Sequence, residues 1–205
     1  MSASAAVVDL FALAGIVTAL SAAVQGQADP ADELVASLRK GGYVLVMRHA
    51  SSPREAPDKQ TANADNMKLE RQLDEGGRHG ATAMGAALRN LEIPVGEVLS
   101  SPTYRALETV QLAQLSTPQV QVELGDGGQS MQRVTEAQGA WLRERVAQGP
   151  RGTNTIIVTH MPNIARAFPD WGAVQDGEVV VVGPDQKGGV QPVGRIKIEE
   201  WSRFR

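Results

Sequence analysis

The stretch VLVMRHA at residues 44–50 joins a continuously apolar run to an arginine and a histidine. Its apolar part, preceded by Tyr43, predicts a strand that is buried on both faces, as the strands of parallel sheets are. Arg48 and His49 then stand where that strand ends, next to small polar residues. Because ligands of open parallel sheets bind at the carboxyl ends of the strands, this exit is a candidate binding site.

Short apolar runs and helical segments alternate along the rest of the chain. We expect helices at 31–39, 73–91, 102–115 and 130–148, a short helix from Pro162, and strands at 43–47, 98–99, 120–123 and 155–158. Beyond Pro169, two further strands at 178–182 and 194–199 extend or edge the same sheet. This order predicts an α/β fold, a three-layer α/β/α sandwich with a mainly parallel central sheet.

The bulk composition favours one globular domain and excludes several classes of partner. The chain has 205 residues, of which 42% are hydrophobic, enough for a single compact core. Its 20 basic and 23 acidic residues produce a weak global field, so we expect no nucleic-acid partner. The absence of cysteine excludes disulfides and thiolate metal sites, and the three histidines lack the spacing of a metal site. We therefore expect neither a metal nor a cofactor.

Residues 1–28 predict a secretory signal peptide in front of a single domain at 29–205. They contain an uncharged apolar run, after which Gly26 and Ala28 supply the small residues that a signal peptidase accepts. The run is short for a bilayer span, so we expect no stable membrane insertion after cleavage and a periplasmic or secreted protein. However, no basic residue precedes the run, and Asp9 stands there instead. The alternatives are an ordinary N-terminal helix or a misplaced start codon, and the protein would then be cytoplasmic.

Arg105 follows the carboxyl end of a second predicted strand. The strand at 98–99 leads into Ser101 and Pro102, which we expect to be the cap and the first position of the next helix. Arg105 then lies near the helix N-terminus, where the helix dipole disfavours a cation. An anion bound jointly by the guanidinium group and the helix N-terminus explains why an arginine stands there.

The sequence places a second histidine, His160, at the exit of the strand at 155–158. We expect it to join Arg48, His49 and Arg105 with no matching carboxylate beside them. Such a set forms a pocket for a tetrahedral oxyanion, and the planar fork of arginine suits phosphate in particular. The sequence therefore predicts that the partner is phosphate or a small phosphorylated substrate.

Four motifs resemble the histidine phosphatase superfamily, which includes phosphoglycerate mutases, acid phosphatases, phytases and small bacterial phosphohistidine phosphatases. They are VLVMRHA (44–50), LDEGGR (73–78), VLSSPTYRALET (98–109) and IIVTHMPN (156–163), in the family's order. The resemblance, to the short bacterial branch, implies a phosphoglycerate mutase-like fold. It also implies that His49 becomes a phosphohistidine and that Arg48, Arg105 and His160 surround the phosphoryl oxygens. A neutral imidazole is a good nucleophile, and nearby guanidinium groups favour that neutral form.

The general acid that protonates the leaving oxygen stays open. In the acid phosphatase branch an aspartate follows the second histidine, but here Met161 follows His160. The mutase-like branch takes a glutamate from after the third strand, where Glu123 and Asp126 are available. Glu178, at the start of a later strand, is the third candidate.

These observations predict a metal-independent phosphomonoesterase that works through a phosphohistidine intermediate. An exported enzyme would suit phosphorylated envelope sugars, such as lipopolysaccharide heptose phosphates, whereas a cytosolic one would suit phosphohistidine proteins. The alternative is a non-catalytic phosphate- or phosphosugar-binding module. Such a module would keep the four residues Arg48, His49, Arg105 and His160 around the phosphate, here called the cage, and would lack a competent general acid. The sequence does not fix the oligomeric state.

Other polar residues near the motifs are interpreted as solvated. His79, on the helix at 73–91, is expected to face solvent. Arg54, Lys59 and Arg71 belong to a long polar stretch and could reach a substrate, but exposure at the surface is the commoner fate of such residues.

Overall fold

The computed structural model describes residues 29–53, 70–126, 134–185 and 187–204. The predicted signal peptide at 1–28, Arg54, Lys59 and the first part of the helix expected at 130–148 lie outside these ranges. The helices are α1 (Pro30–Lys40), α2 (Glu75–Asn90), α3 (Tyr104–Leu112), α4 (Glu136–Ala147) and α5 (Met161–Ala167), with 3-10 helices η1 (Val122–Leu124), η2 (Pro169–Trp171) and η3 (Trp201–Arg203). The strands are β1 (Val44–Arg48), β2 (Val95–Ser100), β3 (Gln119–Val120), β4 (Asn154–Thr159), β5 (Val179–Pro184) and β6 (Val190–Ile196).

These strands form one sheet in the order β3-β2-β4-β1-β5-β6. The first four strands of the chain pair in parallel, β5 runs antiparallel to β1, and β6 runs antiparallel to β5. The prediction of a mainly parallel sheet that the two last strands extend is therefore confirmed.

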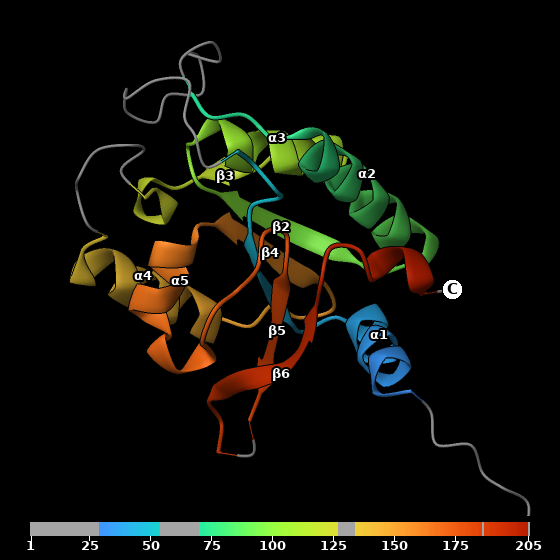
Figure 1. The fold of residues 1–205 in the computed structure, drawn as a ribbon. Coiled ribbons are helices and arrows are strands. Elements are labelled where there is room, and N and C mark those ends of the chain that lie inside the picture. The colour runs from blue at the N-terminus through green and yellow to red at the C-terminus, as the bar shows by residue number, and fades with distance from the viewer. Residues whose placement is uncertain (1–28, 54–69, 127–133, 186, 205) are drawn as a thin grey trace, which may run out of the picture.

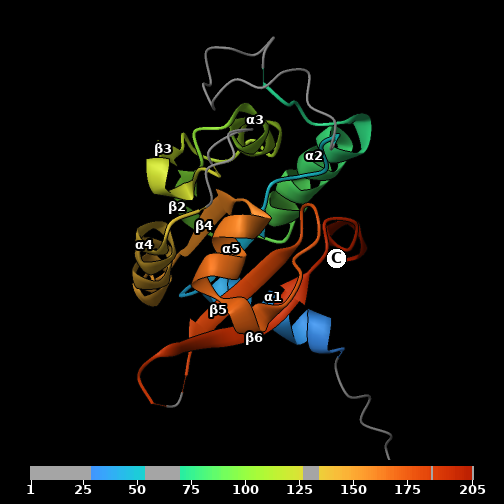
Figure 2. The same cartoon turned by 60° about the vertical axis from the view of Figure 1, so that its left-hand side comes forward.

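The helices cover the sheet on both faces. In Figures 1 and 2, α2 and α3 lie on one side of the sheet, and α4 and α5 lie on the other. Along β1, Leu45 and Met47 pack into the core beneath α1, α2 and α3, whereas Val44 and Val46 pack into the core beneath α4 and α5. The strand is continuously apolar because it serves two cores. The predicted three-layer α/β/α sandwich is confirmed.

The main departure from the expected elements is the strand predicted at 120–123. Only Gln119 and Val120 pair with β2, because β2 ends at Ser100 and β3 is the edge strand. The chain then turns into the 3-10 helix η1. Within the described ranges, no helix is long and apolar enough to cross a bilayer.

One edge of the sheet collects the ends of the three central strands β2, β4 and β1. The backbone N–H of His49 donates to the carbonyl of Thr159 at 3.0 Å, which aligns the exits of β1 and β4. Since β5 is antiparallel, it begins at this same edge. The backbone N–H of Arg48 donates to the backbone carbonyl of Glu178 at 3.2 Å, and the backbone N–H of Gly177 donates to the backbone carbonyl of His49 at 3.0 Å. The fold therefore brings segments from both ends of the domain to one edge.

Candidate active site

His49 and His160 lie at the ends of the neighbouring strands β1 and β4, with ring centroids 5.1 Å apart. His49 Nδ1 is 2.8 Å from the carbonyl oxygen of Ala50. A carbonyl only accepts, so Nδ1 carries the proton and Nε2 keeps its lone pair. That lone pair accepts a hydrogen bond from Nε–H of Arg105 at 3.2 Å. The geometry thus fixes the tautomer in which Nε2 can act as a nucleophile.

His160 is held from both ring nitrogens. Its Nδ1 lies 3.1 Å from Arg105 Nη2, a donor, so Nδ1 accepts. Its Nε2 then donates to the hydroxyl of Ser101, at 2.8 Å. Arg105 therefore connects the two imidazoles.

Both histidines are nearly fully buried, and burial is the largest cause that lowers their pKa values. The pKa of His49 falls well below 6.5, with further lowering by the charges of His160 and Arg105. The pKa of His160 also falls well below 6.5, because Arg105, Arg71 and Arg48 add to the effect of burial. At neutral pH both rings are therefore neutral, as a nucleophilic imidazole must be.

Arg105 lies in the first turn of α3, as predicted, but the cap differs from the prediction. The N-cap residue is Thr103, not Ser101, and the helix begins at Tyr104 rather than Pro102. The Glu70 carboxylate accepts from the backbone N–H of Tyr104 at 2.6 Å, so this carboxylate caps the helix from a distant part of the chain. The anion expected at this helix terminus is thus supplied in part by the protein itself.

Two carboxylates pair with the arginines, contrary to the expectation of an unmatched cationic set. Asp126 Oδ2 lies 2.6 Å from Nη2 of Arg105, and Asp176 Oδ1 lies 2.6 Å from Nη2 of Arg48. Arg48 also donates from Nη1 to the carbonyl of Val174 at 3.0 Å. The expectation failed because both aspartates are distant in sequence: one follows η1, and the other precedes the antiparallel strand β5.

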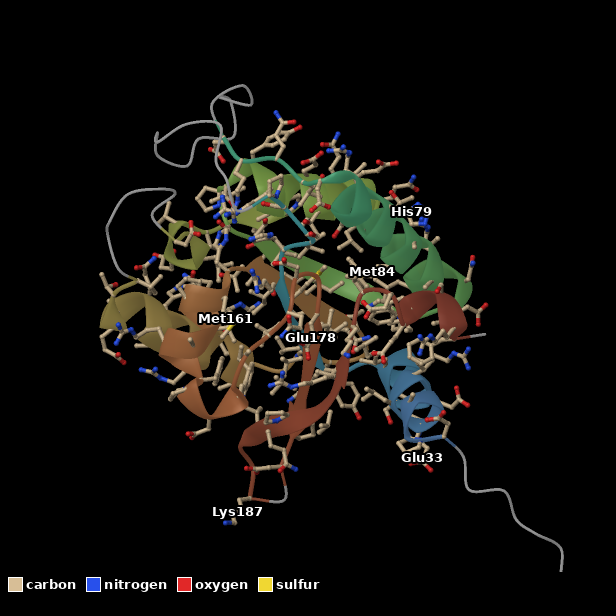
Figure 3. All side chains as sticks on the ribbon, in the orientation of Figure 1. Glu33, His79, Met84, Met161, Glu178 and Lys187 are labelled. Carbon is tan, nitrogen blue, oxygen red and sulfur yellow. The ribbon has the colours of Figure 1, made fainter. Side chains whose placement is uncertain are left out.

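Of the three candidate acids, Asp126 is the one beside the histidines, 3.5 Å from Nδ1 of His160. Glu178 is directed elsewhere, since its carboxylate accepts from the N–H of Gln175 at 2.7 Å and pairs with Arg195 at 3.2 Å. Glu123 contributes its backbone carbonyl to hydrogen bonds with two side chains of α4 and α5. Figure 3 labels Glu178 at the start of β5.

Three side chains form hydrogen bonds with the turn that precedes Asp126. Gln138 and Asn163 each donate to the carbonyls of Glu123 and Gly125, and Thr159 donates to that of Leu124 at 2.8 Å. The carbonyls of η1 would otherwise be unpaired as the edge strand ends. The position of Asp126 is therefore set by the sheet and by both helices on that face.

Arg71 lies at the candidate site, although the sequence analysis favoured exposure at the surface for it. It is partly buried rather than solvated, and burial lowers its pKa, as does the charge of Arg105. Asp126 and Asp176 are close enough to raise that pKa in turn. The segment around Arg71 is held against α3, because Glu70 caps that helix and the N–H of Leu73 donates to the Glu108 carboxylate at 2.9 Å. The available signal was its place just before the start of α2, whose N-terminus must lie at the same edge.

Two arginine side chains of the candidate site have an unsatisfied hydrogen-bond donor. The Nε–H groups of Arg48 and Arg71 are buried and have no hydrogen-bond partner among the described residues. In the same ranges, no group of three or more His, Asp or Glu side chains is placed to hold a metal ion. His79 is exposed on the outer side of α2, as expected (Figure 3). Guanidinium donors around neutral histidines suit a tetrahedral oxyanion.

Comparison with known proteins gives a likeness of fold. No family model matches the sequence, and neither does any curated protein. The structure of the protein histidine phosphatase SixA complexed with tungstate has a TM-score of 0.53 and 20% identity, covering 77% of this chain and 98% of that chain. The open reading frame Rv3214 of Mycobacterium tuberculosis has a TM-score of 0.52 and 19% identity, covering 73% and 94%.

A phosphoserine phosphatase mutant of Entamoeba histolytica, in complex with phosphoserine, has a TM-score of 0.53 and 10% identity, covering 77% of this chain and 98% of that chain. At these identities the likeness shows the fold alone. The phosphoglycerate mutase-like fold implied by the four motifs is therefore confirmed, and the chain shares it with the solved SixA and phosphoserine phosphatase structures.

Proposed function

We propose that this chain is a histidine phosphatase, a metal-independent phosphomonoesterase that transfers the phosphoryl group of its substrate first to His49 and then to water. The observation that carries the proposal is the tautomer of His49. Its Nε2 lone pair faces the guanidinium group of Arg105, while burial and neighbouring charge keep the ring neutral. The solved phosphatases of the same fold support this assignment.

In the proposed first step, the phosphoryl group enters among Arg48, Arg105 and His160. Its oxygens replace Asp126 as partners of Arg105, which frees the Nε2 lone pair and the carboxylate, and the freed carboxylate then takes up a proton from solvent. The Nε2–P bond forms as the P–O bond to the leaving group breaks, and the leaving oxygen takes a proton from Asp126. Guanidinium donors stabilise the charge on the transferring group.

In the second step, water attacks the phosphohistidine. Asp126, now a carboxylate, accepts a proton from that water as the N–P bond breaks, and His49 regains its lone pair. A bound dianion favours the protonated form of a neighbouring imidazole, so His160 takes up a proton from solvent on Nδ1 as the dianion binds and donates to the phosphate. Its Nε2 stays bound to Ser101 throughout.

Replacement of Asp126 by asparagine tests the general acid. We expect kcat/KM for alkyl phosphates to fall by about 10²- to 10⁴-fold, the usual contribution of acid catalysis. The loss with p-nitrophenyl phosphate should be far smaller, because p-nitrophenolate leaves without protonation. Steady-state rates across a series of leaving groups measure this difference.

Glu123→Gln is the matched control, since it removes a carboxylate from the same turn. It should leave the dependence on the leaving group unchanged. An equal loss for all leaving groups in Asp126→Asn would show that Asp126 does not supply the proton.

Phosphate release from p-nitrophenyl phosphate in the presence of a chelator tests the activity itself. We expect turnover without added metal and a phosphoenzyme that is stable to base and labile to acid, as a phosphoramidate is. Binding of inorganic phosphate, detected by calorimetry without turnover of any phosphate ester, would instead assign the chain to the non-catalytic binding modules.

We also propose that residues 1–28 direct export and that the mature protein begins at Asp29. The apolar run and the small residues Gly26 and Ala28 support this. An exported enzyme would act on phosphorylated envelope sugars, a cytosolic one on phosphohistidine proteins. N-terminal sequencing of the protein purified from its native cell should begin at Asp29, whereas a sequence that begins at Met1 or Ser2 would contradict export.

A further inference from the structure

Among the described residues, the candidate site is most deeply buried at its histidines and more exposed at the ion pair of Arg48 and Asp176. His160, His49 and Arg105 are only 1%, 2% and 4% exposed. The side chains of Arg48 and Asp176, by contrast, are 24% and 34% exposed. A group esterified to a phosphoryl group in the cage extends from the buried histidines towards solvent, and the ion pair of Arg48 and Asp176 forms part of the solvent-facing rim of the site.

The Asp176 carboxylate is held in place at that rim. The backbone N–H of Gly177 donates to the backbone carbonyl of His49, so the backbone after Asp176 is bound to the end of β1. Before it, the N–H of Gln175 donates to the Glu178 carboxylate at 2.7 Å, and Arg48 binds both Asp176 and the carbonyl of Val174. A charge fixed in this way acts on whatever part of the substrate lies beside it.

The charge balance of the site makes this carboxylate decisive for selectivity. Before substrate binds, three guanidinium cations face the carboxylates of Asp126 and Asp176, and both histidines are neutral. When substrate binds, the phosphoryl oxygens take the guanidinium donors and Asp126 is protonated as the general acid, so Asp176 keeps its negative charge beside the leaving group. A further carboxylate on the substrate would meet Asp176 without compensation, whereas a hydroxyl or ammonium group there would find a hydrogen-bond acceptor.

We infer that Asp176 is a specificity-determining residue that selects phosphate esters of alcohols bearing a further hydroxyl or ammonium group and rejects esters bearing a carboxylate. The inference rests on the proposed phosphatase activity and names the substrate class of the same site. Polyol and sugar phosphates and phosphorylated amino alcohols belong to the favoured class, and phosphorylated hydroxy acids to the rejected one.

The test compares glycerol 3-phosphate with 3-phosphoglycerate, which differ by a hydroxymethyl group in place of a carboxylate. For the unmodified protein we expect kcat/KM to favour glycerol 3-phosphate by about 10-fold or more, the scale of one unscreened charge near a protein surface. In Asp176→Asn the preference should shrink to within about 2-fold, since the amide removes the charge. The amide oxygen still accepts from Arg48, so the cage is retained.

Asp170→Asn is the matched control, because Asp170 is an exposed acid in the same connection between α5 and β5. It removes the same charge and should leave the preference unchanged. The same preference in Asp176→Asn and the unmodified protein, with p-nitrophenyl phosphate turned over by both, would overturn the inference and leave the phosphatase activity standing. Absence of turnover with every substrate would overturn the proposed function and the inference with it.

Discussion

Replacement of His49 by alanine is expected to abolish phosphoryl transfer, with kcat/KM for p-nitrophenyl phosphate lower by at least about 10⁴-fold. The reason is that the variant lacks the Nε2 lone pair that forms the bond to phosphorus. His160 does not substitute for it, because its Nε2–H donates to Ser101 and its Nδ1 is protonated in the proposed complex with a phosphoryl dianion, so neither nitrogen offers a lone pair. Initial rates and detection of the phosphoenzyme after an alkaline quench measure the two aspects of the loss.

Two further measurements serve as controls for this prediction. His79→Ala removes an exposed histidine from α2 and should leave turnover unchanged. Calorimetry should show that His49→Ala still binds inorganic phosphate, since the arginines remain, and this also establishes that the variant is folded. Turnover by His49→Ala within about 10-fold of the unmodified protein would refute the role of His49 as nucleophile.

The four residues predicted for the site lie at one edge of the sheet because they follow a general rule of parallel sheets. Arg48, His49 and His160 each end a strand or follow it directly, and Arg105 lies in the first turn of the helix after another. The three strands β2, β4 and β1 are neighbours in the sheet, so their carboxyl ends are adjacent. The local pattern of apolar residues was sufficient to locate these ends.

Asp176 was not predicted, Asp126 was named only as one of three candidate acids and Arg71 was expected to be solvated, each for a different physical reason. Asp176 reaches the site because β5 is antiparallel, and the direction of a strand is not readable from its apolar pattern. Asp126 reaches it because the edge strand ends after Val120 and the chain turns into η1, where a longer strand was expected. Arg71 reaches it through the contact of Glu70 with α3, a pairing across the sequence that no local pattern predicts.

The second large effect is expected from Arg105→Ala. Arg105 contacts His49, His160 and Asp126 at once, at 3.2, 3.1 and 2.6 Å, and is almost fully buried. Its loss removes a fixed donor to the transferring group, and by analogy with an oxyanion-hole donor kcat should fall by about 10²- to 10³-fold. Arg105→Lys should recover only part of this, because an ammonium group does not donate to two partners in one plane.

The comparison with Arg71→Ala distinguishes transition-state stabilisation from simple attraction of the substrate. Arg71 is nearer to solvent than Arg105 and acts on the site through its charge, so its loss should mainly raise KM, whereas loss of Arg105 should mainly lower kcat. Arg151→Ala, a change at an exposed arginine, should alter neither constant. A kcat for Arg105→Ala within about 3-fold of the unmodified protein would mean that the guanidinium group orients the two histidines without taking part in phosphoryl transfer.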